Sequence, residues 1–241
     1  MLFRSGYDLE ISWPMMRQLI EKDGYAWVGA SAQPVGIEYL RNWDTQRYGS
    51  LAHPGLPPGW SRQRTAAGAN SEGTVTISQE TYSFDVFSKI ATALRTRGAQ
   101  MLGGVSPKRI IAFGASQSAG RLTNLLNGLA PTDKPYDGYI LYVGPGVLQK
   151  EPNVPVFGLN SEAEMQRYLT IRRPDSRFYH YWEVPGSGHL PRAARDTLAQ
   201  ESQRDHPEEP RGIRCDAAPP PQTMEYAGRA VLNHLNNWII S

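Results

Sequence analysis

The segment 109–121, with the sequence RIIAFGASQSAGR, constrains the fold of this chain more than any other part of it. Its residues 110–113 are apolar, with β-branched and aromatic side chains, a pattern typical of a buried strand. The leucines that follow have the i, i+3, i+4, i+7 spacing of the apolar face of a helix: Leu122, Leu125, Leu126 and Leu129. Because only residues 114–118 separate the two patterns, the sequence predicts a strand that turns sharply into a helix.

The small residues in this turn indicate a nucleophile elbow. In so tight a turn, the side chains two positions before and after the central residue would collide, and Gly114 and Ser118 occupy those positions around Ser116. The helix that follows would direct backbone N–H groups, and the positive end of its dipole, at charge that develops near Ser116. We therefore predict Ser116 as a catalytic nucleophile and the N–H of Gln117 as an oxyanion donor.

Two other interpretations of the same residues are open. Ser116 or Ser118 could simply be the N-cap of an ordinary helix, because a bare Gly-x-Ser-x-small pattern is frequent by chance. Ser118 could also be the nucleophile, with Ser116 and Gly120 as its small neighbours. The apolar strand pattern ends at Phe113, which favours Ser116 as the corner of the turn.

Helical and strand-like patterns alternate along the rest of the chain. Helices are expected at 12–23, 84–94, 162–171 and 227–238, and strands at 25–31, 138–143, 154–159 and 177–184. This alternation predicts an α/β fold, a mostly parallel sheet covered by helices on both faces. The length of 241 residues suits a single domain over residues 1–241.

Two stretches carry little regular pattern. Residues 33–82 have few periodic apolar positions, and the part at 52–81 is rich in proline, glycine, serine and threonine. We expect a long surface loop there, either a lid over a site or an insertion. Residues 200–222 form a second polar segment that is rich in proline.

The composition excludes several classes of partner and site. With 25 basic and 23 acidic residues, the chain has no charge excess that would favour a nucleic acid or another polyanion as partner. Its one cysteine, Cys215, rules out an internal disulfide framework and a multi-cysteine metal site. A membrane span and a secretory signal peptide are not expected, because no apolar run has the required length or flanks. We expect neither a metal nor an organic cofactor.

A serine nucleophile needs a base within hydrogen-bond reach, and in this architecture the acid and the histidine follow the serine along the chain. Of the five histidines, only His189 directly follows a predicted strand, in a glycine-flanked turn. The others precede the serine, lie inside a strand, lie in a polar loop or lie on the last helix: His53, His180, His206 and His234, respectively. The sequence therefore predicts His189 as the general base.

The acid is expected just after the strand 154–159, where Glu162 and Glu164 both lie. Glu164 has a structural alternative, because Ser161-x-x-Glu164 fits a capping box that opens the next helix. We therefore predict Glu162 as the triad acid, with Glu164 as the second candidate.

With these residues, the chain resembles the α/β-hydrolase domain family whose elbow reads Gly-x-Ser-Gln-Ser-Ala-Gly-Arg. The likeness runs from about Gly24 to Trp238 and also rests on the segments 24–33, 43–51, 53–55, 83–88, 137–138, 161–162, 174–175 and 182–184. It implies an α/β-hydrolase fold and a serine hydrolase that acts on a small-molecule carboxylic ester. By this resemblance Ser116, His189 and a glutamate form the triad. Alternatives are an acyltransferase with the same triad and a non-catalytic binding domain.

The chain departs from this family in two places. The segment 56–81 is longer than we expect for the family. The family also has strands before the segment that begins at Gly24, and those strands help to supply a second oxyanion donor. We therefore expect a sheet that lacks some N-terminal strands, as in an N-terminally truncated fragment.

Overall fold

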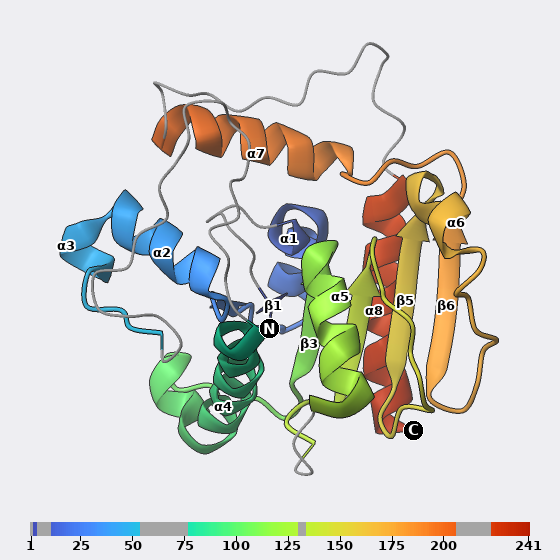
Figure 1. Cartoon of the computed structure of the whole chain (residues 1–241), viewed down its shortest axis with the longest axis horizontal. Helices are drawn as coiled ribbons and strands as arrows, with labels where there is room; N and C mark the ends of the chain where they lie inside the picture. The colour runs from blue at the N-terminus through green and yellow to red at the C-terminus, as the bar shows by residue number, and fades with distance from the viewer. Residues whose placement is uncertain (1, 4–10, 54–76, 130–133, 206–222) are drawn as a thin grey trace.

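We analysed a computed structural model of the chain, which describes residues 2–3, 11–53, 77–129, 134–205 and 223–241 (Figure 1). Six parallel strands form one sheet in the order β2-β1-β3-β4-β5-β6. The strands are β1 (Leu2–Phe3), β2 (Gly29–Ala30), β3 (Ile111–Ala115), β4 (Gly138–Tyr142), β5 (Val156–Ser161) and β6 (Tyr179–Val184). The predicted parallel sheet is confirmed.

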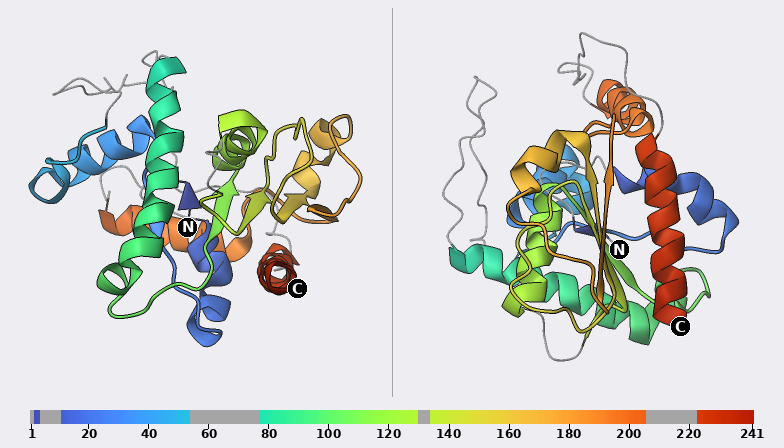
Figure 2. Two further views of the ribbon diagram at one scale, coloured as in Figure 1. Left: turned by 90° about the horizontal axis from the view of Figure 1, so that it is seen from below. Right: turned by 90° about the vertical axis from the view of Figure 1, so that its right-hand side faces the viewer.

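Helices cover both faces of this sheet (Figure 2). The α-helices in the described ranges are α1 (Ser12–Lys22), α2 (Pro34–Trp43), α3 (Thr45–Tyr48), α4 (Ile77–Met101), α5 (Gln117–Asn124), α6 (Glu162–Tyr168), α7 (Arg192–Asp205) and α8 (Thr223–Ile240). Helices α4 and α5 pack on one face, and α1 and α8 pack on the other. None of the helices in the described ranges is long and apolar enough to cross a membrane.

The core alternates between the two faces as a pleated sheet requires. On β3, Ala112 belongs to the cluster under α4 and α5, whereas Phe113 belongs to the cluster under α1 and α8. All residues of β4 and β5 are buried, which is the pattern of central strands that are covered on both sides. These two strands therefore form a rigid support for the residues that follow β3, β5 and β6.

Most of the expected elements are confirmed within a few residues, but three helices were not predicted. Helices α2 and α3 lie in the stretch 33–82, where we expected little regular structure. Helix α4, predicted at 84–94, begins earlier than expected, at Ile77. Helix α7 extends to residue 205, into the segment expected to be irregular. The apolar residues of α7 are three alanines and Leu198, too few and too small to form a clear apolar stripe from which a helix could be predicted.

Two other expectations have a mixed outcome. Of the strand predicted at 25–31, the described part of the sheet contains Gly29–Ala30, which pairs in parallel with Leu2–Phe3 of β1. The lid or insertion predicted at 52–81 lies largely outside the described residues, as does most of the segment 200–222.

Candidate active site

Ser116 lies at the corner between β3 and α5, with φ 54° and ψ −119°. A residue with a side chain reaches such a positive φ only at a cost of about 1–3 kcal/mol, and such residues concentrate at functional sites. Ser116 occupies the N-cap position of α5, yet its side chain makes no capping hydrogen bond. Capping therefore does not explain the serine. Ser118 is buried at 3% exposure within α5, so its hydroxyl is poorly placed to meet a substrate.

Two glycines make room for this corner. A Cβ on Gly114 would lie 2.5 Å from the backbone oxygen of Ser118, as the predicted steric argument requires. A Cβ on Gly144, which follows β4 and has φ 148°, would lie 2.9 Å from the Cα of Ser116. The Ser116 N–H donates to the Tyr142 carbonyl at 2.8 Å, which ties the corner to β4. The turn is therefore held in its strained conformation from both sides.

The N-terminus of α5 presents backbone donors beside Ser116. The Ser116 carbonyl accepts the N–H groups of Ala119 and Gly120, at 3.0 and 3.2 Å. Gln117 precedes these first intrahelical hydrogen bonds, so its N–H is one of the donors that a helix leaves for another acceptor. This is the position in which an oxyanion donor is useful.

His189 contacts Glu164 directly, with 2.5 Å between the ring Nδ1 and the carboxylate Oε1. The other carboxylate oxygen of Glu164 accepts the Ser161 N–H at 3.3 Å and the Ser161 hydroxyl. The capping box of Ser161 and Glu164 is therefore confirmed, and Glu164 still reaches the histidine. Burial by itself raises the pKa of the Glu164 carboxyl. The hydrogen bonds from His189 and Ser161, with the charge of His189, outweigh burial and lower that pKa overall.

Contacts before and after His189 fix the loop that carries it. The Gly186 N–H donates to the Glu162 carboxylate at 2.5 Å, and the Ser187 hydroxyl donates to the Val184 carbonyl at 2.5 Å. Beyond the histidine, the Ala193 N–H at the start of α7 donates to Glu225 of α8 at 3.0 Å. These contacts limit the positions that the His189 ring can take.

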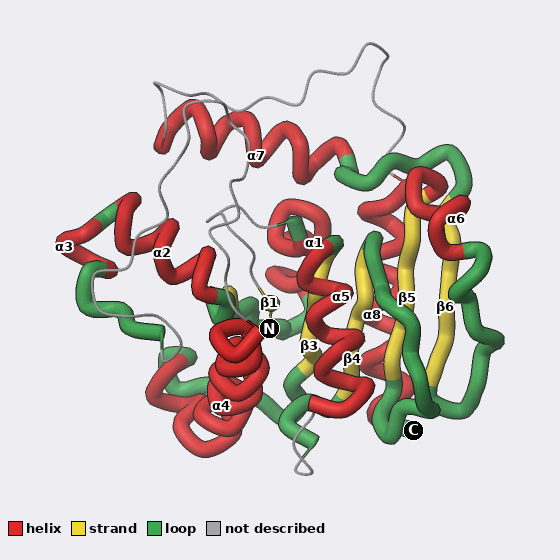
Figure 3. The backbone as a smooth tube through the Cα atoms, in the orientation of Figure 1, coloured by secondary structure: helices red, strands yellow, loops and turns green. Residues whose placement is uncertain are grey.

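The three candidate residues follow three parallel strands and therefore lie at the same edge of the sheet. Ser116 follows β3, Glu164 lies in the first turn after β5, and His189 lies in the loop after β6. The register aligns the strand ends, because Ala115 pairs with Tyr142 and Ser161 pairs with Val184. Helices α5 and α6 both begin at this edge, and α7 crosses above it (Figure 3). Active sites in open α/β sheets lie at this carboxyl edge.

The match to a family model agrees with this geometry. The model of the alpha/beta hydrolase domain matches residues 1–241. The chain belongs to this α/β-hydrolase family. Neither the search of curated proteins nor the search of solved structures finds a match. The family resemblance and the fold class predicted from the sequence are thereby confirmed.

Within this α/β-hydrolase domain, Glu162 has a different task from Glu164. The Glu162 carboxylate accepts the Gly186 N–H, so it holds the turn that leads to His189. The sequence favoured Glu162 as the residue that orients the histidine. In the structure the carboxylate that meets the His189 ring belongs to Glu164.

The other described histidines have packing partners of their own, and His206 lies outside the described residues. His53 is 4% exposed; burial lowers its pKa, and a hydrogen bond with the Ala32 backbone opposes that shift. His180 stacks on Trp238 with 4.2 Å between ring centroids, and His234 packs edge-on against Trp182 at 5.3 Å. Among the described residues, no cluster of three metal-ligating side chains is present.

Sequence reasoning did not identify Gly144 and Glu225. Gly144 lies in a Gly-Pro-Gly turn directly after β4, a signal that could have pointed to a close backbone approach. Glu225 gave no such signal, because its contact with Ala193 joins two helices that are distant in sequence.

Proposed function

We propose that this α/β-hydrolase domain cleaves a small carboxylic ester through an acyl-enzyme on Ser116. The observation that carries the proposal is the contact between Glu164 and the Nδ1 of His189. A carboxylate at Nδ1 requires the proton on that nitrogen, so Nε2 carries the lone pair and can accept a proton from a serine. The strained backbone at Ser116 independently supports its assignment as the nucleophile.

The reaction begins when Ser116 Oγ attacks the ester carbonyl carbon and its proton moves to His189 Nε2. The carbonyl oxygen becomes an oxyanion that accepts the Gln117 N–H, and the Glu164 carboxylate stabilises the imidazolium. The C–O bond to the alcohol then breaks, and the departing oxygen takes the proton from His189. This leaves the acyl group bonded to Ser116.

Water completes the cycle by attacking the acyl carbonyl while His189 takes one of its protons. The bond to Ser116 Oγ breaks, the serine regains its proton from His189, and the carboxylic acid leaves. Both halves use the same base, acid and oxyanion donor, so loss of any one of them slows both. The chemistry requires His189 Nε2 within about 3 Å of the serine oxygen in the substrate complex.

Covalent labelling with a fluorophosphonate, together with p-nitrophenyl acetate hydrolysis, tests this proposal. The wild-type chain should be labelled on the tryptic peptide that contains Ser116, and Ser116→Ala should lose both labelling and turnover. Ser118→Ala is the matched control and should keep both, since that hydroxyl is buried inside α5. Labelling that survives in Ser116→Ala, or a folded wild type that is neither labelled nor active, would refute the proposal. The latter result would indicate a non-catalytic domain.

A further inference from the structure

The connection between β4 and β5, residues 143–155, is described throughout and contains no helix, although the two strands are parallel neighbours. Parallel neighbours are usually joined by a helical crossover, whose backbone groups are satisfied within the helix itself. The backbone of this connection therefore needs hydrogen-bond partners from other elements. Figure 3 shows the connection passing beside α5, and side chains of that helical segment supply several of these partners.

Thr123 of α5 binds the first part of the connection. Its side chain is 1% exposed, and its hydroxyl accepts the Gly146 N–H at 3.0 Å. The same hydroxyl donates to the Ala119 carbonyl at 3.0 Å, one turn earlier in the helix. A Cβ on Gly146 would lie 3.2 Å from the Thr123 methyl carbon, so a glycine lets the connection approach α5 without displacing that side chain. Thr123 therefore fixes Gly146 by a hydrogen bond and by close packing.

Asn127 binds the next part of the connection. It lies in the π-helical turn Leu125–Leu129 that continues α5, and such turns are frequent at functional sites. Its side chain donates to the Val147 carbonyl at 2.7 Å and accepts the Gln149 N–H at 2.8 Å. One amide side chain thus satisfies a backbone carbonyl and a backbone N–H of the connection. Because Asn127 lies four positions after Thr123, both residues bind the connection from the same side of the helical segment.

The beginning of the same connection lies against the proposed nucleophile. A Cβ on Gly144 would lie 2.8 Å from the Ser116 carbonyl oxygen, so the two backbones are in direct contact. Val143, the residue before Gly144, has φ 42°, which is unusual for a β-branched residue. Its side chain is 1% exposed and packs in the core under α1 and α8. The strained turn at Ser116 therefore packs against a second strained turn.

Two strained turns in contact keep their conformation only if the surrounding structure holds them. Only Pro145 separates Gly144 from the first anchored residue, Gly146. Loss of the anchors would let residues 143–145 relax, and Gly144 would no longer press on the Ser116 turn. A displacement of about 1 Å at a reacting group can cost about 100-fold in rate, so small movements of this turn matter.

We propose that Thr123 and Asn127 are positioning residues for Ser116. They hold residues 146–149 against the helical segment, and this keeps Gly144 on the turn that directs the Ser116 hydroxyl. Helix α5 thereby fixes the nucleophile twice, through the turn at its N-terminus and through the connection that returns along its side. This role rests on the proposed function of Ser116, and neither positioning residue takes part in the chemistry itself.

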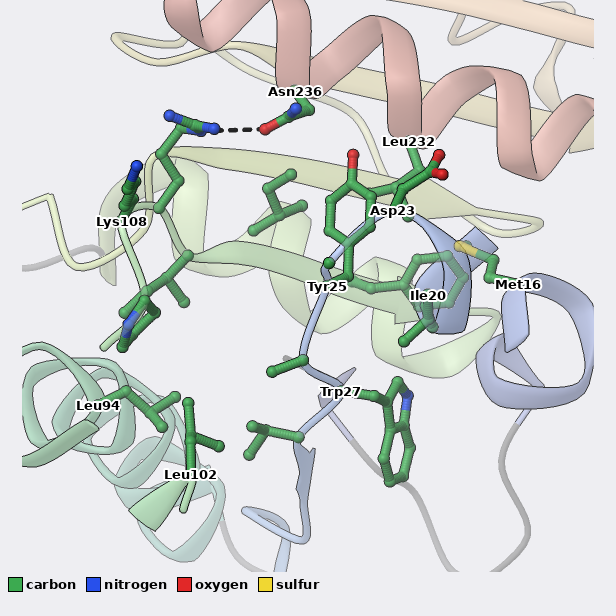
Figure 4. A pocket seen from close by; sticks show the side chains of 18 of the residues that line it. Met16, Ile20, Asp23, Tyr25, Trp27, Leu94, Leu102, Lys108, Leu232 and Asn236 are labelled. Atoms are coloured by element: carbon green, nitrogen blue, oxygen red, sulfur yellow. Dashed lines mark hydrogen bonds between the residues drawn. The ribbon is translucent and has the colours of Figure 1, made fainter. Parts of the chain in front are cut away.

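Asn127→Ala is the first test, at a partly exposed position where the substitution should leave the fold intact. It should lower kcat for p-nitrophenyl acetate by about tenfold or more, with KM within about twofold of wild type, and slow fluorophosphonate labelling by a similar factor. Asn236→Ala is the matched control. Asn236 is also partly exposed and accepts a hydrogen bond from the Arg109 Nε at 3.0 Å, before the amino end of β3 (Figure 4). Its kcat should equal that of wild type.

Thr123→Val and Thr123→Ser separate the hydroxyl from the rest of the side chain. Valine has a helix propensity close to that of threonine but no hydroxyl, so kcat should again fall by about tenfold or more. Serine keeps the hydroxyl and should retain kcat within about threefold of wild type. Rates are measured well below the lowest Tm of the set. A lower Tm with unchanged kcat in both Asn127→Ala and Thr123→Val would show that the anchors stabilise only the fold, and would overturn the proposal. Equal losses of kcat in Asn127→Ala and Asn236→Ala would overturn it as well.

Hydrogen exchange with mass spectrometry gives a readout that does not depend on activity. The Ser116 N–H donates to the Tyr142 carbonyl at 2.8 Å, so a loosened turn should exchange this proton faster. Exchange in the segment 114–118 should be faster by about tenfold in Asn127→Ala and Thr123→Val, and unchanged in Asn236→Ala. If the wild type is neither labelled nor active, the proposed function fails, and unchanged exchange in both variants would then overturn the positioning role as well. An active wild type whose kcat and exchange survive both substitutions would overturn the positioning role alone.

Discussion

Glu164→Gln is the substitution that separates the proposed catalytic role of Glu164 from its structural role. One carboxylate oxygen accepts the Ser161 N–H and hydroxyl, and the other meets His189 Nδ1. Glutamine has one acceptor oxygen and one NH₂ group, and only the oxygen can accept the Ser161 N–H. The NH₂ group is then directed at His189 and donates to Nδ1. This places the ring proton on Nε2, where it blocks proton transfer from Ser116.

The expected loss of kcat for Glu164→Gln is about 10⁴-fold, the size seen when a triad aspartate becomes asparagine and the tautomer is wrong. The capping bond survives in neutral form, so the free energy of unfolding should fall by only about 1 kcal/mol. Ester turnover measured across substrate concentrations should show a lower kcat with little change in KM. Thermal unfolding of the same samples gives the stability.

Glu162→Gln is the matched control for this prediction. Its amide oxygen can still accept the Gly186 N–H, so turnover should fall by less than about tenfold. The reasoning fails if Glu162→Gln abolishes turnover while Glu164→Gln retains it. It also fails if Glu164→Gln unfolds the protein, since the glutamate would then be needed mainly for the fold.

Three further predictions follow from individual contacts. The folded protein lowers the Glu164 carboxyl pKa below its ordinary 4.5, so ionised Glu164 stabilises the fold above that pH and this contribution is lost on acidification. The Tm difference between wild type and Glu164→Gln should therefore shrink as pH falls below about 4.5; a difference that grows would contradict this. Gly144→Ala brings a Cβ to 2.8 Å from a backbone oxygen of the nucleophile turn and should cost about 2–4 kcal/mol in urea unfolding. Gly128→Ala meets nothing within 4 Å and should stay within about 0.5 kcal/mol of wild type. Glu225→Ala removes the acceptor of the Ala193 N–H and should cost about 1–3 kcal/mol and lower kcat by loosening the loop of the proposed base. Glu225→Gln keeps an acceptor and should retain most of both; equal losses would disprove the role of that hydrogen bond.

Several features of this protein were predictable because their causes are local. The tight turn around Ser116 follows from steric contacts between residues two to four positions apart, so Gly114 and Ser118 were enough to indicate it. The capping box of Ser161 and Glu164 spans four residues and was likewise visible in the sequence. Apolar periodicity identified most strands and helices that are buried in the core, although α2, which buries Ile37 and Leu40, was missed.

Other features depend on partners far away in the chain, and for these the sequence was insufficient. Helix α7 has few apolar residues, of which Ala194 is buried, so its helical state left only a weak periodic pattern in the sequence. Residues 25–28 have the composition of a strand, but pairing depends on a neighbour at the right place in the sheet.

The two glutamates show most clearly which features the sequence determines and which the tertiary structure decides. The sequence determined that a carboxylate would follow β5 and that Glu164 would cap α6, because capping involves only residues a few positions apart. From the sequence alone, its capping role made Glu164 only the second candidate for the triad acid. Only the tertiary structure decided which carboxylate meets His189, since that contact joins a helix and a loop through residues 25 positions apart in the chain. A carboxylate has two oxygens that accept in different directions, so one residue can cap its helix and orient the histidine at the same time.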